Sequence, residues 1–440
     1  MTSSSIDPAE SNDTIYLKHV TEVGETRGIT ASEDILNEAG VKVLKKGANI
    51  NSSVFSKIAS HKLIKPIDNS ISIKDALCSR DIAKLAQDLA KQDGFLRDLL
   101  MRVPGSSTLF SIISQVNILP QLQTKLTIQQ QSMPAHFQHA IMMTVFTLVL
   151  GIRLKLEDED LYNLALAALF HDIGELHIEH EIFTSTKRLL PEQRSQIEVH
   201  PVIAYALLSQ FPQYHPNVSI PVLEHHERLD GAGYPKGVSG DSISYSGSLL
   251  SLSSMAISMI ERGLGGRIAC AIKAYPKKYD SNIAREILEL TRGLVLDETL
   301  KEQSSRKAFY EKLFETFYYL DSWASICRQC SDFGDAGDVG QVIDLINMRL
   351  EEVQQDLRSS GLHSMHVGML VNDIDTNNEV LTDAEHALNE VHYQMSDIVY
   401  EVVRKWPDVY YDPANDTGQL ISNWLLRIIS YEDPDYVFIY

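Results

Sequence analysis

The chain has 440 residues, of which 44% are hydrophobic and 22% charged, a balance typical of a soluble globular protein with an ample core. Its formal net charge of −20 gives a surface that repels nucleic acid and acidic membranes, which excludes both as bulk partners. The longest apolar run, residues 140–152, is shorter than the roughly 20 residues that a membrane span needs. With no secretory signal visible, we expect a cytoplasmic protein without a membrane span and without a nucleic acid polymer as partner.

The first part of the chain predicts a tail followed by a small module. The tail, residues 1–15, begins with a stretch rich in Ser, Asp and Glu that lacks an apolar core, so we expect it to be disordered. Residues 16–70 hold short β-like runs, such as Val41–Leu44, between turns at Gly40 and Gly47. We therefore expect a compact β-rich module there.

The next two segments predict a helical connector and then a histidine-rich region. Residues 71–132 carry apolar residues at three- and four-residue spacing, with a break at Pro104-Gly105, and show no catalytic signal. Residues 133–299 are different, because nine of the fifteen histidines fall between His136 and His226, where uniform placement would put about three. The clustering indicates a site.

The pattern inside this region favours metal binding. A single histidine beside an apolar helix is more often a hydrogen-bonded core residue, and a His-Asp doublet is common by chance. Here, however, five histidines and one aspartate occur at helix ends and before a Gly-rich loop, and nitrogen and oxygen ligands of this kind suit divalent metals. Asp172 can bridge two metals through its two oxygens. The candidate ligands are His139, His171, Asp172, His200, His225 and His226.

Residues 300–440 predict amphipathic helices whose role the sequence does not indicate. Cys327 and Cys330 have CxxC spacing, but no second pair accompanies them, so we interpret them as neighbours on adjacent turns of one helix. His363 and His366 lack nearby acidic residues and are interpreted as surface or packing residues.

The histidine-rich region resembles the HD-GYP family, a branch of the HD phosphohydrolase superfamily. The matching elements are His139, the run His171–Gly174, His200-Pro201 and the long run His225–Pro235. The resemblance is clear over residues 133–295 and weak over the N-terminal module. It implies a mainly α protein: an HD-type helical domain, preceded by a small β-rich module and followed by a helical C-terminal region.

The resemblance also implies chemistry. Family members hold two or three divalent metals and hydrolyse cyclic di-GMP. By position, the six candidates would bind two metals, iron or manganese in preference to zinc or magnesium, with His171 and Asp172 at the catalytic centre and Asp172 bridging. A metal-bound hydroxide would attack phosphorus in line. The residues expected beside the substrate are Arg228, Asp230, Gly233, Tyr234 and Lys236. A purely structural role for Tyr234 stays open.

Several positions depart from the family pattern. Glu175 stands where the family has a lysine, and Ser254 stands where it has a further aspartate ligand. Ser248 replaces an arginine and Ser185 a second lysine, although Lys187 and Arg188 lie close by in the sequence. The nearest acids that could substitute for the aspartate are Asp241 and Glu261. Two extra histidines, His177 and His180, are expected to face solvent.

Three functions stay open. The primary prediction is a metal-dependent phosphodiesterase acting on cyclic di-GMP or another small phosphoester, because all six ligand positions are kept. The alternative is a diverged, catalytically weak or inactive module that binds nucleotides, or a protein partner or second copy through its C-terminal helices; Ser254 and Glu175 favour this reading. The third is an HD hydrolase with another substrate, since Glu175 disfavours a second phosphate nearby.

Overall fold

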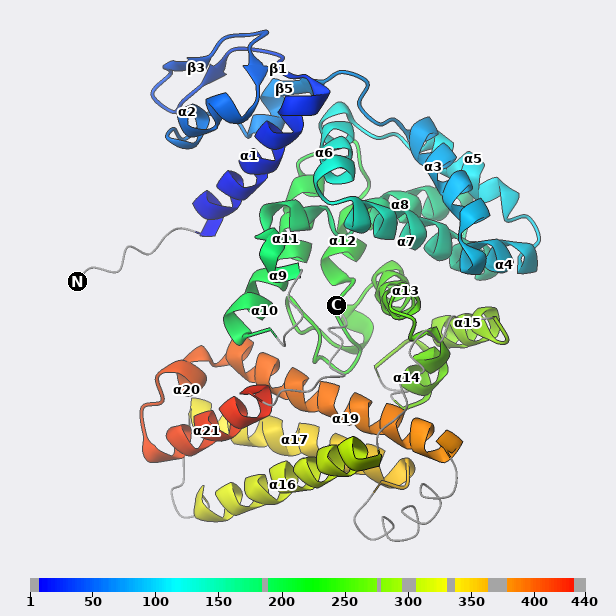
Figure 1. The fold of residues 1–440 in the computed structure, drawn as a ribbon, viewed down its shortest axis with the longest axis vertical. Helices are drawn as coiled ribbons and strands as arrows, with labels where there is room; N and C mark the ends of the chain where they lie inside the picture. Colours follow the sequence, from blue (N-terminus) through cyan, green and yellow to red (C-terminus); the bar gives the residue numbers. More distant parts are fainter. Residues whose placement is uncertain are drawn as a thin grey trace.

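A computed structural model gives the fold, in which three parts follow one another along the long axis (Figure 1). The N-terminal module lies at one end, the ligand-bearing helices in the middle and a C-terminal bundle at the other end. One hydrophobic core extends over residues 16–290, and a second over residues 309–429. The predicted fold class is confirmed. The structure describes residues 8–183, 189–274, 278–294, 306–330, 337–362 and 378–430.

The N-terminal module consists of short strands and one long helix. Strand β1 is the centre of an antiparallel sheet of order β4-β1-β5, and β2 pairs antiparallel with β3. After His61 the chain forms one isolated bridge, between Asn37 and Leu63. The elements are α1 (Pro8–Arg27), β1 (Ile29–Ala31), β2 (Ile35–Leu36), β3 (Lys42–Leu44), β4 (Asn49–Ile50), η1 (Ser52–Val54), α2 (Phe55–Ala59), η2 (Ile67–Ser70) and β5 (Ile71–Ile73).

Helix α1 corrects the prediction of a disordered tail, which is wrong for residues 8–15. Tyr16, Leu17, Val20 and Val23 are buried at three- and four-residue spacing, so the second half of the helix packs on the core. Extending an established helix toward its N-terminus needs no new nucleus, and this allows a polar segment to continue it. Composition alone does not reveal that the second half of α1 packs on the core.

The connector is helical, as predicted, and the middle part is a cluster of helices around α7. Helix α7 is long and apolar enough to cross a membrane by length and composition, but 72% of that window is buried inside the protein, as in a core helix. The elements are α3 (Ser79–Gln92), α4 (Gly94–Arg102), α5 (Ser107–Gln115), α6 (Pro120–Ser132), α7 (Pro134–Arg153), α8 (Asp158–Phe170), η3 (Ile173–His177), α9 (His180–Phe183), α10 (Pro191–Ile197), α11 (His200–Ser209), α12 (Pro216–Glu224), η4 (Gly240–Ser242), α13 (Tyr245–Glu261), η5 (Gly265–Arg267), α14 (Ile268–Ala274) and α15 (Ser281–Thr291).

The C-terminal region is a bundle of amphipathic helices, as predicted. Trp323 and Trp424 meet in its core with ring centroids 4.8 Å apart. Cys327 and Cys330 both lie in α16, whereas His363 and His366 lie outside the described residues. The helices are α16 (Arg306–Cys330), α17 (Asp338–Ser359), α19 (Asn378–Lys405), α20 (Pro407–Tyr411) and α21 (Asp416–Ser430).

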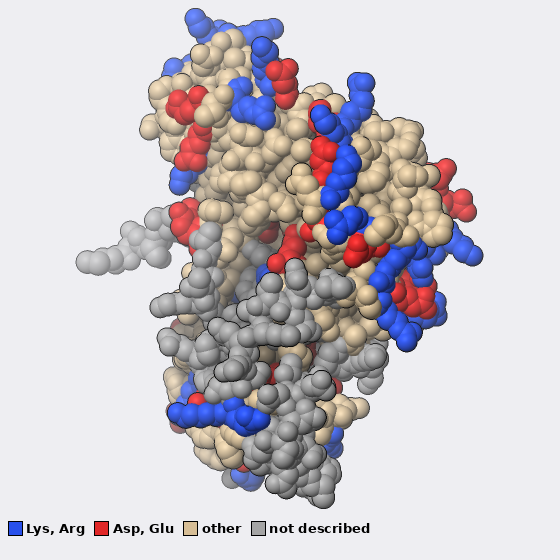
Figure 2. Space-filling view, turned by 45° about the vertical axis from the view of Figure 1, so that its right-hand side comes forward, with Lys and Arg blue, Asp and Glu red and all other residues tan. Residues whose placement is uncertain are grey.

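Acidic and basic side chains lie next to one another on the face of the N-terminal module and connector that Figure 2 shows. Ion pairs such as Lys91 with Asp88 and Lys65 with Glu33 account for part of this mixture. On this part of the surface, therefore, the negative net charge is not gathered into one patch.

Candidate metal centre

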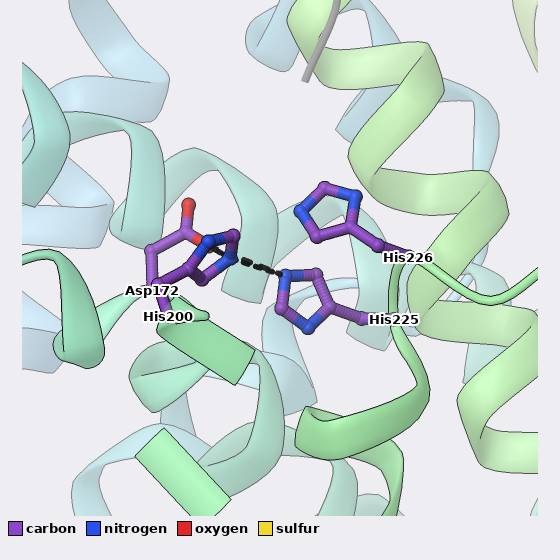
Figure 3. Close-up of side chains that lie close together, drawn as sticks. All are labelled: Asp172, His200, His225 and His226. Atoms are coloured by element: carbon purple, nitrogen blue, oxygen red, sulfur yellow. Dashed lines mark hydrogen bonds and ion pairs between the residues drawn. The ribbon is translucent and has the colours of Figure 1, made fainter. Parts of the chain in front are cut away.

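The ends of four helices bring the predicted ligands together in the middle of the molecule. His139 lies near the start of α7, and the doublet His171-Asp172 follows the end of α8. His200 is the first residue of α11, and the pair His225-His226 follows the end of α12. Figure 3 shows Asp172 and His200 on one side and the histidine pair on the other, pointing toward one another. Except for His139 and Asp172, all of them are buried.

Gly174 lets two of these helix ends approach closely. A Cβ atom at this position would lie 2.2 Å from the carbonyl oxygen of His200 and 3.1 Å from the backbone nitrogen of Ala204. Any side chain would therefore push η3 away from the start of α11. The glycine after the His-Asp doublet sets the separation between Asp172 and His200.

Backbone carbonyl groups orient three of the histidines. Each donates its Nδ1–H to the carbonyl oxygen of the residue three positions earlier, which fixes the tautomer and leaves the Nε2 lone pair free to bind a metal. The pairs are His171 with Ala168 at 2.8 Å, His200 with Ile197 at 2.7 Å and His225 with Val222 at 2.6 Å.

The two oxygens of Asp172 face two different pairs of imidazoles. Oδ2 lies 2.8 Å from Nε2 of His171 and 3.7 Å from Nε2 of His139. Oδ1 lies 3.2 Å from Nε2 of His200 and 3.3 Å from Nε2 of His225. Ligand atoms thus form two groups that share Asp172: one with His139 and His171, the other with the remaining three histidines.

The donor set fits divalent metal ions. Nε2 of His171 is buried and has no hydrogen-bond partner among the described residues, although Asp172 Oδ2 is near. Because Nδ1 of His171 carries the proton, Nε2 has a lone pair and no hydrogen. Nε2 and the carboxylate oxygen are then both acceptors, and no hydrogen bond can form between them. A cation between the two atoms would satisfy both.

The protonation of three candidate ligands, Asp172, His225 and His226, suits metal binding. Burial raises the pKa of Asp172, but the imidazoles of His171, His200 and His225 outweigh burial and hold that pKa well below its usual value. Burial lowers the pKa of His200, but Asp172 outweighs burial and raises that pKa. Burial lowers the pKa of His225 to about 4, and it lowers the pKa of His226 well below its usual value. The carboxylate is therefore charged and this histidine pair neutral at pH 7, which are the forms that ligate metals.

Comparisons with known proteins found relatives of the central segment. Residues 121–262 match the family model described as HD domain. The cyclic di-GMP phosphodiesterase PdeB of Borreliella burgdorferi is 28% identical over 169 residues, which are 37% of this chain and 44% of that protein. This central segment therefore matches an HD domain. The 3'3'-cGAMP-specific phosphodiesterase 3 of Vibrio cholerae is 32% identical over 106 residues, 24% of this chain and 23% of its own length. Bd1817, a HDG"Y"P protein from Bdellovibrio bacteriovorus, aligns over 62% of this chain and 98% of its own at 14% identity, with a TM-score of 0.34.

The chain thus spans less than half the length of these curated relatives. The resemblance to the HD-GYP family is confirmed for the central domain, and the named relatives are phosphodiesterases.

Two carboxylates, Glu175 and Glu261, hold histidines of α7. Glu175 is buried, and its Oε2 lies 2.6 Å from Nδ1 of His136. Glu261 Oε2 lies 2.6 Å from Nδ1 of His139. Burial lowers the pKa of His139, but Glu261 outweighs burial and raises the pKa to about 9. The pairing of His136 with Glu175 was not predicted from the sequence. The available signal was the spacing of three between His136 and His139, which places both on one face of a helix.

Glu261 is the acid that reaches the site from the helix where HD-GYP proteins have their further aspartate. Ser254 is buried in α13, and Glu261 follows seven residues later, two turns along the same face. Asp241, the other candidate, is exposed in η4. Glu261 contacts Nδ1 of His139, so it orients a candidate ligand in the way that outer carboxylates of metal sites orient theirs.

The loop from Glu227 to Gly240, here called the GYP loop, is folded on itself beside the histidine pair. Glu227 accepts hydrogen bonds from the backbone N–H groups of Lys236 at 2.7 Å and Val238 at 3.1 Å. The ring of Tyr234 stacks on His226 with centroids 4.6 Å apart, and its hydroxyl has no hydrogen-bond partner among the described residues.

Three of the five predicted substrate residues line the cavity beside the candidate ligands. Tyr234, Gly233 and Arg228 line a cavity of about 140 Å³ together with His225 and His226. Asp230 and Lys236 are not among the residues that line it. Asp230 pairs with Arg228, and Lys236 is exposed.

The two extra histidines differ from each other. His177 is buried and stacks on Tyr16 of α1 at 4.9 Å between centroids, so the expectation that it faces solvent is wrong. The sequence did not indicate that α1 packs on η3 and so covers His177. His180 is exposed, as expected. The positions of Ser185, Lys187 and Arg188 lie outside the described residues.

Proposed function

We propose that this HD-GYP domain is a metal-dependent phosphodiesterase that hydrolyses cyclic di-GMP or a related small phosphoester. The observation that carries the proposal is that each oxygen of Asp172 faces its own set of imidazole Nε2 atoms. A carboxylate between two sets of nitrogen ligands is the arrangement that a two-metal site requires. The names of the relatives supply the substrate class.

The candidate ligands form two metal-binding sets. Asp172 would hold two metal ions, one together with His139 and His171 and the other together with the remaining three histidines. We propose iron or manganese over zinc and magnesium, which is what the resemblance to the HD-GYP family implies. When bound, such ions lower the pKa of water and withdraw charge from phosphoryl oxygens.

Tyr234 is the residue placed to contact the phosphoryl group. Burial raises the pKa of its hydroxyl above the usual value, so the hydroxyl keeps its proton and remains a donor. Its hydroxyl lacks a hydrogen-bond partner among the described residues, and its ring packs on the ligand His226. We propose that it donates a hydrogen bond to a phosphoryl oxygen next to the second metal site.

A diverged module with weak or no activity is the second candidate. It is favoured by Glu175, a buried anion where the family has a phosphate-binding lysine, and by Ser254, which brings no carboxylate. Such a protein would bind the nucleotide and act through a protein partner. We propose a cytoplasmic location for either function.

The decisive experiment measures metal content and turnover together. Protein purified without oxygen should contain close to two metals per chain, and with iron or manganese it should release the linear dinucleotide from cyclic di-GMP. Metal-loaded protein that binds cyclic di-GMP without hydrolysing it would support the second candidate. An absence of bound metal and of turnover would contradict the phosphodiesterase.

A further inference from the structure

The C-terminal bundle packs directly against the GYP loop. Helix α19 bonds to this loop and also packs on α10 and α14 of the middle part. Arg404 donates to the carbonyl oxygen of Gly233 at 3.0 Å and pairs with Glu198 of the HD domain at 3.0 Å. Tyr400 donates its hydroxyl proton to the carbonyl oxygen of Leu189 at 3.0 Å. The bundle therefore holds the loop that flanks the metal ligands.

Arg228 of the GYP loop has both edges of its guanidinium occupied. One edge pairs with Asp230 of the same loop, with Nη2 2.8 Å from Oδ2 and Nε 3.2 Å from Oδ1. The remaining nitrogen, Nη1, donates to Oδ2 of Asp397 on α19 at 2.6 Å. A paired arrangement of this kind is how arginine also binds a phosphate.

The carboxylates of Asp230 and Asp397 differ in how easily they could separate from Arg228. The Asp230 side chain is 7% exposed and belongs to the loop, so it moves with Arg228. The Asp397 side chain is 37% exposed and belongs to another part of the chain. Water reaches Asp397 from one side, because the ion pair with Arg228 is only partly buried, so an anion from solution can compete for this position.

The space next to Arg228 is small while α19 is in place. The cavity of about 140 Å³ beside His225 and His226 has Glu390, Tyr393 and Asp397 of α19 in its wall. Pockets for small organic ligands have volumes of about 300–1,000 Å³. A cyclic dinucleotide therefore cannot fill this side of the site unless α19 moves away.

We propose that the C-terminal bundle inhibits the HD-GYP site from within the same chain, with the carboxylate of Asp397 taking the place on Arg228 that a substrate phosphate would occupy. The inference rests on the proposed function in that it takes the ligand to be an anionic phosphoester. A phosphoester can bind Arg228 only when Asp397 of α19 has separated from that arginine. Any partner that draws α19 away would then activate the site.

The test compares variants of the full chain, carrying its metal, in the binding of inorganic pyrophosphate by calorimetry. Asp397→Ala frees one charged donor of Arg228, so we expect pyrophosphate to bind about tenfold more tightly. Asp397→Asn keeps the shape but not the charge and should change the affinity in the same direction. The matched control is Asp344→Ala, which removes an exposed carboxylate of α17 in the same bundle and should leave the affinity unchanged.

A double variant assigns the effect to Arg228. The gain should disappear in Asp397→Ala combined with Arg228→Gln. Equal affinity in the native chain and Asp397→Ala would overturn the proposal, as would a gain that persists in the double variant or an absence of pyrophosphate binding in all proteins. Turnover of cyclic di-GMP is followed in the same samples: turnover without the affinity gain contradicts only the inhibition, and the gain without any turnover contradicts only the phosphodiesterase.

Discussion

Replacing Gly174 by alanine should separate the two halves of the metal site. The added Cβ would lie 2.2 Å from the carbonyl oxygen of His200, where an ordinary carbon–oxygen contact is roughly 3.4 Å, so η3 and the start of α11 must move apart by about 1 Å. Overpacking of this size costs about 1–3 kcal/mol in the free energy of unfolding. The same shift moves Asp172 away from His200, and a displacement of about 1 Å is expected to lower turnover by about 100-fold.

The assay measures thermal unfolding, metal content and turnover on one preparation. The matched control is Gly94→Ala at the start of α4, where the nearest atom to a new Cβ, the Arg97 Nη2, is 3.7 Å away, an ordinary contact. We expect the control to behave as the native chain. If Gly174→Ala kept the metal content, turnover and melting temperature of the native chain, the close approach of η3 and α11 would not determine the site.

Three further substitutions test the ligand set and one tests the fold. Asp172→Ala removes the bridging carboxylate and should abolish turnover; undiminished turnover would exclude the metal mechanism. Glu261→Gln weakens the orientation of its histidine partner on α7 and should lower metal affinity by about 10–100-fold in a chelator competition, and an unchanged affinity would make the contact incidental. Ser254→Asp adds a carboxylate to the same face of α13 and should raise metal occupancy; constant occupancy would show that this position does not face the metals. Asp68→Ala leaves Lys125, which is buried and 2.6 Å from Asp68, without its counter-charge, and should destabilise by about 3–5 kcal/mol in denaturant unfolding, whereas a loss below about 1 kcal/mol would show that water replaces the carboxylate.

The candidate ligands could be predicted because their signal is local. His171, His200 and His225 each bond to a carbonyl three residues earlier, so the orientation of each ring depends on its own helix end. The Gly-rich run after His226 and the doublet before Gly174 are short patterns that a sequence displays directly. That the five histidines meet around Asp172 could be seen only in the structure, and the role of these residues as ligands stays a prediction.

The partners of these residues could not be predicted, because they depend on packing between distant elements. Glu261 reaches His139 across 122 positions, and the choice of Glu261 over Asp241 follows from two full turns of α13 packed on α7. His177 faces inward because α1 covers it, and α1 forms where composition indicated a tail. Periodicity assigns residues to a helix face but does not say which other element meets that face.

The same limit explains why the C-terminal helices seemed unrelated to the site. Their apolar stripes account for the second core, and this part of the reasoning needed only helical spacing. Arg228 and Asp397 are 169 positions apart, and both are polar residues that a hydrophobic pattern leaves unassigned. From the sequence, Arg228 in the Gly-rich loop is therefore expected to contact only the substrate. In the folded chain, substrate must compete for it with a carboxylate from another part of the chain, so the loop that marks the family is also the point where α19 can act on the site.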